Sequence, residues 1–216
     1  SNRKIMADVN RIFTYLENSK TRINVLRSCK TLIVCPTGMR TQLNMLINRE
    51  IKNATRKKKA AITIKLNSLS DELLILKLEE AAKAGVEINM LIRGICCMYP
   101  ENKKFKKPVH AISIVDEYLE HARVLIFHNS GDEKVFISSA DWMVRNIDHR
   151  VEAACPVTDK QIKKELIDII NIQLSDNVKA RILDNAGSNQ YVNPRNKPKV
   201  RSQVETYNYL HNKKYT

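Results

Sequence analysis

Short apolar runs alternate with longer segments of helical periodicity through the first half of the chain. Three of these runs have the length and composition of buried strands: residues 31–35, 61–67 and 86–94. Between the first two, apolar side chains in residues 39–51 recur at the spacing of one helix face. Asp71 is placed to begin a second helix, and Gly85 is placed to end it. This β-α-β-α-β order predicts a parallel sheet covered by helices.

The second half of the chain predicts further strands and one long helix. The strands are expected at residues 110–116, 122–128, 133–141 and 150–157. Residues 129–132 are typical of a hairpin turn that joins two of these strands. Thr158 and Asp159 are expected to begin the helix. Its inner face should carry Ile162, Leu166, Ile169, Ile170 and Leu174.

The two ends of the chain differ from this central part. Residues 9–26 predict an amphipathic helix with one apolar stripe: Val9, Ile12, Phe13, Leu16 and Ile23. Residues 184–201 are rich in Asn, Pro and basic residues and are expected to be irregular; the helical spacing beyond them fits a short docked helix and a frayed tail equally. We therefore expect a linker helix in residues 1–30, a single α/β domain in 31–184 and a basic tail in 185–216.

Composition favours a compact globular protein. The 216 residues are 43% hydrophobic, and a chain of this length buries roughly two-thirds of its unfolded surface. No apolar run approaches the ~20 residues that span a bilayer, and the N-terminus lacks the apolar stretch of a signal peptide. We therefore expect a cytoplasmic protein, with membrane association left open. The five cysteines lack the C-x2-C spacing of zinc sites and are expected to be reduced.

The charge of the chain indicates a polyanionic partner. Lys and Arg number 37 against 23 Asp and Glu, which gives a formal net charge of +14. Nucleic acid, nucleotide phosphates, inorganic phosphate chains and acidic lipids would all be attracted. Aromatic residues make up only 6% of the chain, which argues against a single-stranded nucleic acid bound by base stacking. The basic runs at 56–59 and 103–107 are either solvated surface or a guide for an anionic chain.

The strongest candidate chemistry lies around His121. On a strand, His121 and Arg123 point to the same side, so an acid–base group and a fixed cation can address one ligand. The following hairpin returns Ser138 and Asp141 to the same edge. Asp141 can orient His121, coordinate magnesium or cap the next turn. Lys65 and Asn67, where the second strand ends, either line the same cleft or are a solvated lysine and a turn asparagine.

Two family resemblances follow from these segments. His121, Arg123 and the Ser138–Ser139 pair resemble the H-x-K and G-S-x-N pattern of the phospholipase D superfamily. Arg123 replaces the lysine of that pattern, and His128 stands where its acidic residue would fall, so phosphodiesterase activity is disfavoured. Residues 65–97, 111–152, 173–183 and 189–210, which include R-G-I-C-C and S-S-A-D-W-M, resemble the C-terminal part of the bacterial polyphosphate kinases.

The second resemblance implies a fold and a reaction. The implied fold is an α/β domain with a phospholipase D-like mixed sheet flanked by helices. The implied reaction transfers the terminal phosphoryl group of ATP reversibly to polyphosphate through a phosphohistidine. That histidine lies upstream in the family, and none of the chain's own histidines matches it: His110, His121, His128, His149 and His211. We therefore expect a fragment that has no kinase turnover by itself.

The resemblance also implies site residues and partners. His121 matches a second active-site histidine that contacts the nucleotide phosphates, Arg93 a nucleotide-binding arginine, and Arg150 another arginine that faces the site. The implied partners are ATP or ADP, polyphosphate, upstream domains of the same polypeptide and, in the full-length enzyme, further copies of it, but no nucleic acid. Magnesium is implied with ATP, held mainly by ligands outside this chain. A noncatalytic polyanion-binding module and a phospholipase D-type phosphodiesterase are the alternatives.

Overall fold

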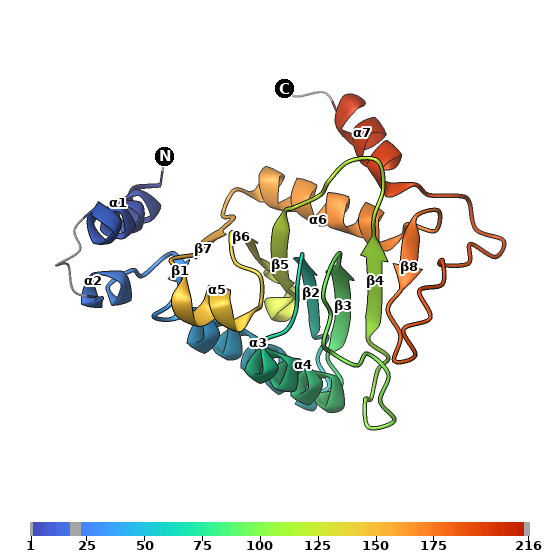
Figure 1. The fold of residues 1–216 in the computed structure, drawn as a ribbon, viewed down its shortest axis with the longest axis horizontal. Helices are drawn as coiled ribbons and strands as arrows, with labels where there is room; N and C mark the ends of the chain where they lie inside the picture. Colours follow the sequence, from blue (N-terminus) through green and yellow to red (C-terminus); the bar gives the residue numbers. More distant parts are fainter. Residues whose placement is uncertain (1, 18–22, 214–216) are drawn as a thin grey trace.

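The computed structural model describes residues 2–17 and 23–213, which form a mixed sheet with helices on both faces (Figure 1). The strand order is β1-β7-β6-β5-β2-β3-β4-β8. The strands are β1 (Ile33–Val34), β2 (Ala61–Leu66), β3 (Glu87–Ile92), β4 (His110–Ile114), β5 (Arg123–Phe127), β6 (Lys134–Ser138), β7 (Ala153–Pro156) and β8 (Ala180–Ile182). The helices are α1 (Arg3–Glu17), α2 (Asn24–Arg27), α3 (Met39–Thr55), α4 (Glu72–Ala84), α5 (Val144–His149), α6 (Lys160–Leu174) and α7 (Ser202–His211), with a short 3-10 turn at Asn129–Gly131.

The directions of the strands bring several of their carboxyl ends to one edge of the sheet. Strands β2, β3 and β4 are parallel, whereas β5 runs antiparallel to β2 and β6 antiparallel to β5. The carboxyl ends of β2, β3, β4 and β6 therefore share one edge with the amino end of β5. Loops at this edge can bring together residues that are far apart in the sequence.

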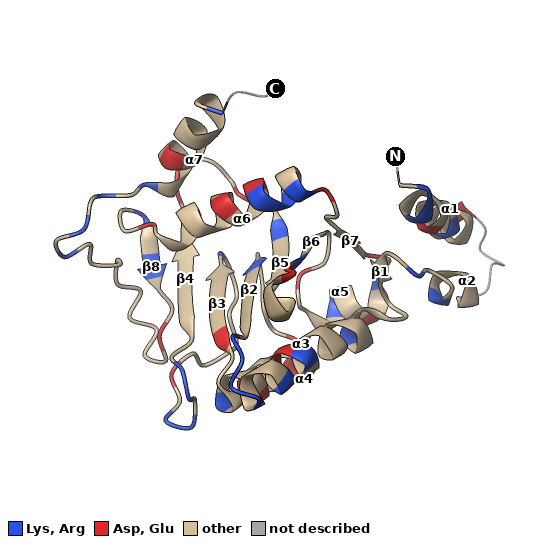
Figure 2. Cartoon of the chain, turned by 180° about the vertical axis from the view of Figure 1, so that it is seen from behind, with Lys and Arg blue, Asp and Glu red and all other residues tan. Residues whose placement is uncertain are grey.

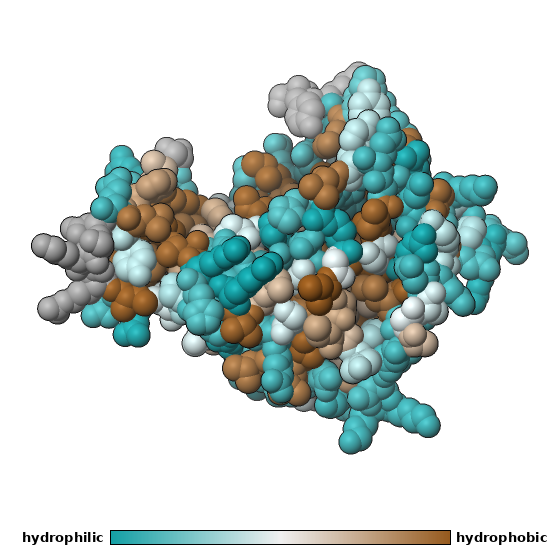
Figure 3. All heavy atoms as spheres, viewed as in Figure 1, coloured by the Kyte–Doolittle hydropathy of each residue, from teal (hydrophilic) through white to brown (hydrophobic). Residues whose placement is uncertain are grey.

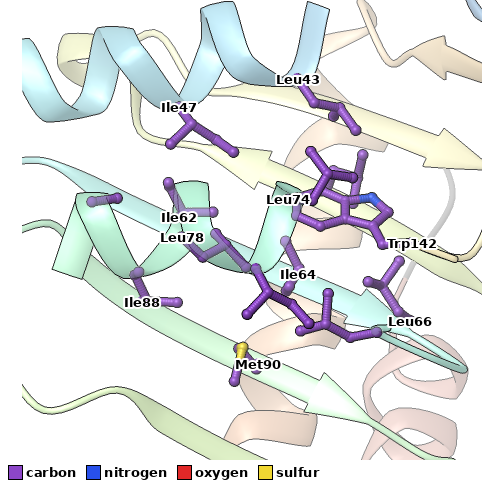
Figure 4. Packing of buried hydrophobic residues seen from close by; sticks show 14 of the residues in the cluster. Leu43, Ile47, Ile62, Ile64, Leu66, Leu74, Leu78, Ile88, Met90 and Trp142 are labelled. Carbon is purple, nitrogen blue, oxygen red and sulfur yellow. The ribbon is translucent and has the colours of Figure 1, made fainter. Parts of the chain in front are cut away.

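The main core lies between the sheet and the helices α3 and α4 (Figure 4). In β2, buried Ile62, Ile64 and Leu66 alternate with half-buried residues, as expected when alternate side chains face opposite sides of a strand. Helix α4 begins at Asp71, whose side chain accepts a hydrogen bond from the backbone N–H of Leu74 at 3.0 Å. It ends at Gly85 in the left-handed conformation, with φ of 104°.

Helix α6 covers the opposite face and packs on a second apolar cluster. Asp159 caps the helix by accepting from the backbone N–H groups of Gln161 and Ile162. The inner face is confirmed for Leu166, Ile170 and Leu174, but Ile162 is 55% exposed and the half-buried Ile169 is not part of this cluster. The buried stripe is centred on Ile170, and at 100° per residue Ile162 falls at its margin.

The predicted N-terminal helix over residues 9–26 was wrong in its extent. Two helices, α1 and α2, replace it, and residues 18–22 of the predicted span lie outside the described residues. Phe13 and Leu16 are exposed, so the stripe is only partly buried. Figure 3 shows apolar atoms uncovered over this part of the molecule. The reason is that α1 packs on the small cluster around Leu26 and Leu32, which covers only one side of it.

At the other end of the chain, α7 is a regular helix. Residues 184–201 contain no helix or named strand, as predicted. The apolar residues Val204 and Tyr207 are exposed, so these two side chains do not hold α7 in place. Instead, the Tyr209 hydroxyl donates a hydrogen bond to Asp168 on α6 at 2.8 Å. Among the described residues, no helix combines the length and hydrophobicity that crossing a bilayer requires.

Candidate functional site

The shared strand edge gathers the predicted site residues from four strands. Asn67 follows β2, Arg93 follows β3, Arg123 begins β5 and Asp141 follows β6. His121 lies two residues before β5. The structure brings two of these candidates together, because Nδ1 of His121 is 3.1 Å from Nη2 of Arg93.

His121 lies between two arginines. Its Nε2 atom is 3.0 Å from Nη2 of Arg123, while Nδ1 faces Arg93. A guanidinium group only donates hydrogen bonds, and a neutral imidazole has one N–H and one acceptor nitrogen. Only one of the two contacts can therefore be a hydrogen bond, and at the other nitrogen two N–H groups face each other. An anionic oxygen beside that pair would accept from both.

Asp141 holds Arg123 in place. Its carboxylate accepts from Nε of Arg123 at 3.1 Å and from Nη2 at 2.9 Å, and also from the backbone N–H groups of Asn67 and Ser68. Burial acts to raise the pKa of Asp141, but the Arg123 contact and the two N–H groups outweigh it, so that its pKa is lowered. Asp141 therefore orients Arg123 as a carboxylate and does not contact His121 directly.

Asn67 holds Arg93. Its Oδ1 atom accepts from Nε of Arg93 at 3.0 Å and from Nη2 at 2.6 Å. Gly94 lies close to the backbone of Asn67: a Cβ atom at Gly94 would be 3.0 Å from the carbonyl oxygen of Asn67. The third guanidinium nitrogen, Nη1, is buried and has no partner among the described residues. Arg93 is thus fixed on one side and keeps an unused donor.

The other candidate residues, in the part of the chain that the structure describes, form no hydrogen bond with the imidazole. The Lys65 side chain is 12% exposed and points to the α6 face, where it contacts Glu120 and donates to Gln173 at 2.8 Å. The Ser138 hydroxyl accepts from the backbone N–H of Ala140 at 3.1 Å and shapes the turn before Asp141. Arg150 is exposed between α5 and β7, and in the described ranges no hydrogen bond or ion pair joins its side chain to this cluster. Its role in the site stays a prediction.

The two basic runs lie away from the site. Residues 56–59 precede β2 and residues 103–107 precede β4, so both are at the amino ends of parallel strands. Figure 2 shows the basic loop before β4 at the end of the sheet opposite the arrowheads of β2, β3 and β4. These lysines therefore do not line the His121 cluster.

The described residues do not fit a protein-held metal ion. No group of three His, Cys, Asp or Glu side chains suited to a metal occurs in residues 2–17 and 23–213. Both oxygens of Asp141 are already used by Arg123 and by backbone N–H groups. The five cysteines are free thiols, as predicted, with Cys35 buried and Cys97 exposed.

Sequence reasoning missed the contacts that surround Glu120. This residue directly precedes His121, and its carboxylate contacts side chains of β2, α6 and α7. Its place beside a candidate histidine was the one available signal. No local sequence pattern marks Gln173 or Gln203, because these residues meet Glu120 only in the folded chain.

Comparisons with known proteins show the family of the chain. The family description "Polyphosphate kinase C-terminal domain 2" matches residues 32–203. A polyphosphate kinase of Vibrio cholerae is 49% identical over 212 residues, which are 98% of this chain and 30% of that protein. The crystal structure of polyphosphate kinase from Porphyromonas gingivalis superposes with a TM-score of 0.91 at 41% identity, over 97% of this chain and 32% of that one.

A more distant structure shares the fold alone. A phospholipase D family member from Salmonella typhimurium has a TM-score of 0.51 at 12% identity and covers 71% of this chain and 97% of its own. The predicted α/β fold is thereby confirmed. The chain spans about a third of the length of the polyphosphate kinases it matches. It belongs to the polyphosphate kinase family, in which it corresponds to the C-terminal domain 2.

Proposed function

We propose that His121, Arg93 and Arg123 bind the phosphate groups of ATP and polyphosphate and form part of a phosphoryl-transfer site. The observation that carries this proposal is the imidazole held between two guanidinium groups, where two N–H groups face each other. Arginine forks match phosphate oxygens, and the buried Nη1 atom of Arg93 adds an unused donor. The net charge of +14 attracts the same class of ligand.

The arrangement can stabilise a transferring phosphoryl group. In such a transfer, the bond from the terminal phosphorus of ATP to its bridging oxygen breaks, and a bond to the acceptor atom forms. Negative charge accumulates on the leaving oxygen of ADP, and fixed cations lower the barrier by stabilising it. Arg93 and Arg123 are held by Asn67 and Asp141, so little reorganisation is needed. His121 can hold a proton at the ring nitrogen that faces a phosphate oxygen.

The acceptor of the phosphoryl group is proposed to lie outside this chain. From the resemblance we expect a phosphorylated histidine in an upstream domain of the same polypeptide, and the cluster contains one imidazole whose two nitrogens both face arginines. We therefore expect the 216-residue chain to bind polyphosphate or ATP without kinase turnover. Magnesium is expected with ATP, held mainly by ligands outside this chain, since the described residues offer no cluster for it.

Binding of polyphosphate to this chain tests the proposal. Isothermal titration calorimetry should show that Arg93→Ala weakens binding about tenfold or more, because a hydrogen bond to a charged group contributes about 1.5–3 kcal/mol. His121→Ala should also weaken it. Lys58→Ala is the matched control, since it removes one positive charge from the exposed run at the opposite edge.

The same titration separates the alternatives. A noncatalytic polyanion-binding module, held by diffuse charge, would bind polyphosphate equally well in all three variants and lose affinity steeply with salt. That result would refute the proposed site. ATP-dependent synthesis of polyphosphate by the 216-residue chain would refute the upstream acceptor. Hydrolysis of a chromogenic phosphodiester would instead favour phosphodiesterase activity.

A further inference from the structure

The segment that carries His121 lacks packing of its own. Residues 115–122 join β4 to β5 without a helix or strand. Their apolar side chains face solvent: Val115 is 66% exposed, Tyr118 68% and Leu119 80%. An irregular segment with so little buried apolar surface is expected to fluctuate unless polar contacts fix it.

Arg201 and Gln203, at the start of α7, supply such contacts from 85 residues further along the chain. Arg201, which precedes the helix, donates to both carboxylate oxygens of Asp116 at 2.8 Å. The side chain of Asp116 is 1% exposed and that of Arg201 is 34% exposed, so this bidentate ion pair is shielded from solvent on the carboxylate side only. The same arginine donates to Glu117 at 3.1 Å.

Gln203 holds the backbone of the segment. Its Oε1 atom accepts from the N–H of Tyr118 at 3.0 Å, and its Nε2 atom donates to the carbonyl oxygen of the same residue at 2.8 Å. One amide side chain thus binds both backbone groups of one residue, as a neighbouring strand would. This fixes the path of the chain three residues before His121.

Gln203 also reaches Glu120, the residue next to His121. Its Nε2 atom lies 3.1 Å from Oε1 of Glu120. The other carboxylate oxygen accepts from Gln173 of α6 at 2.6 Å and contacts Lys65 of β2. Both oxygens of Glu120 are therefore occupied, and three separate elements meet immediately beside the imidazole.

The start of α7 is itself fixed to the body of the domain. Asp176, at the end of α6, accepts from the backbone N–H of Ser202 at 2.7 Å through one oxygen. Its other oxygen accepts from the backbone N–H groups of residues 178–180. A rigid connection thus runs from α6 through Asp176 to the first turn of α7.

We propose that Arg201 and Gln203 are positioning residues for His121. They touch neither the imidazole nor its arginines, and they act by holding residues 116–120 so that the ring stays between Arg93 and Arg123. This inference rests on the proposed function only in so far as the positioned ring binds phosphate. The start of the C-terminal helix thereby helps to hold His121 in place.

The test uses the 216-residue chain with Gln203→Ala and Arg201→Ala. Two controls are matched: Lys199→Ala removes a positive charge nearby, and Val204→Ala shortens an exposed side chain of the same helix. The readouts are amide hydrogen exchange in residues 116–121, the imidazole ¹⁵N signals of His121, and affinity for polyphosphate. Thermal denaturation monitors the fold.

Both test variants should increase exchange in residues 116–121 and shift or broaden the His121 signals, while the controls leave both unchanged. Affinity for polyphosphate should fall about tenfold, in keeping with the sensitivity of such sites to small displacements. Arg201→Lys should restore part of the loss, because it keeps the charge but not the bidentate contact.

Unchanged exchange and unchanged imidazole signals in folded Gln203→Ala would overturn the inference. If Arg201→Ala fails to fold, Gln203→Ala decides, since it removes only a neutral amide. If the unmodified chain does not bind polyphosphate, the proposed function fails, but exchange and imidazole signals still decide whether α7 positions His121.

Discussion

Replacing Asp141 by asparagine should destabilise the fold and displace an arginine of the site at the same time. The Asp141 carboxylate is 6% exposed and pairs with Arg123, which is 13% exposed. Removing one partner of a buried ion pair costs about 3–5 kcal/mol. Asparagine keeps an oxygen that can accept from the backbone N–H groups of Asn67 and Ser68. We therefore expect a loss of about 2–3 kcal/mol in the free energy of unfolding.

Chemical denaturation at neutral pH measures this loss directly. Asp132→Asn is the matched control, because Asp132 also pairs with a cation but lies on the surface, at 71% exposure. Its denaturation midpoint should barely move. An Asp141→Asn midpoint equal to that of the unmodified chain would refute the conclusion that this pair holds the site together.

The pH dependence of the difference in unfolding free energy between the unmodified chain and Asp141→Asn gives a second, independent check. Because the folded-state pKa of Asp141 is lowered, its contribution is fully present above the unfolded pKa of about 3.9 and is lost as pH falls through the folded value. The gap in stability between the unmodified chain and Asp141→Asn should therefore be constant near neutrality and shrink in acid. A gap that widens below about pH 4 would contradict the assigned sign.

Three further predictions concern the framework. Leu43→Ala should lower the free energy of unfolding by about 2–5 kcal/mol in denaturant unfolding, because Leu43 is fully buried. Met45→Ala, on the exposed face of the same helix, should lower it little, and equal effects would contradict the packing. Gly85→Ala should lower the melting temperature, since φ there is 104° and a side chain costs about 1–2 kcal/mol; no change would show that the helix end relaxes. Cys97 should react with a thiol reagent long before Cys35, because burial raises the pKa of Cys35 to about 12, and equal rates would contradict this burial.

Local signals were sufficient for much of the fold. The alternation in residues 61–67, the cap at Asp71 and the glycine at 85 each have their cause within a few residues, so β2 and α4 could be predicted with nearly correct bounds. The placement of Arg93 at this edge followed from a general rule, that open α/β sheets bind ligands outside the carboxyl ends of their strands. The pairing of Arg93 with His121 came from the resemblance to the polyphosphate kinases.

Long-range polar contacts were the part that the sequence did not predict. Strand alternation already turns Lys65 to the face opposite Ile64, but nothing local shows that Glu120 and Gln173 meet it there. The extent of α1 was misjudged for a related reason. The apolar stripe of a helix indicates which side chains can be buried. The tertiary fold decides how many of those side chains are covered.

The two arginines of the site are coupled through a single residue. Asn67 binds Arg93 through its side chain and Asp141 through its backbone N–H, and Asp141 in turn binds Arg123. The loop after β2 therefore sets the distance between both guanidinium groups and, through them, the space left for the imidazole. Since folding itself holds these cations close together, their mutual repulsion is offset by buried contacts with Asn67 and Asp141. Under the proposed function, a phosphate oxygen that entered would relieve the remaining repulsion without moving the framework, which is the property that charge stabilisation in phosphoryl transfer requires.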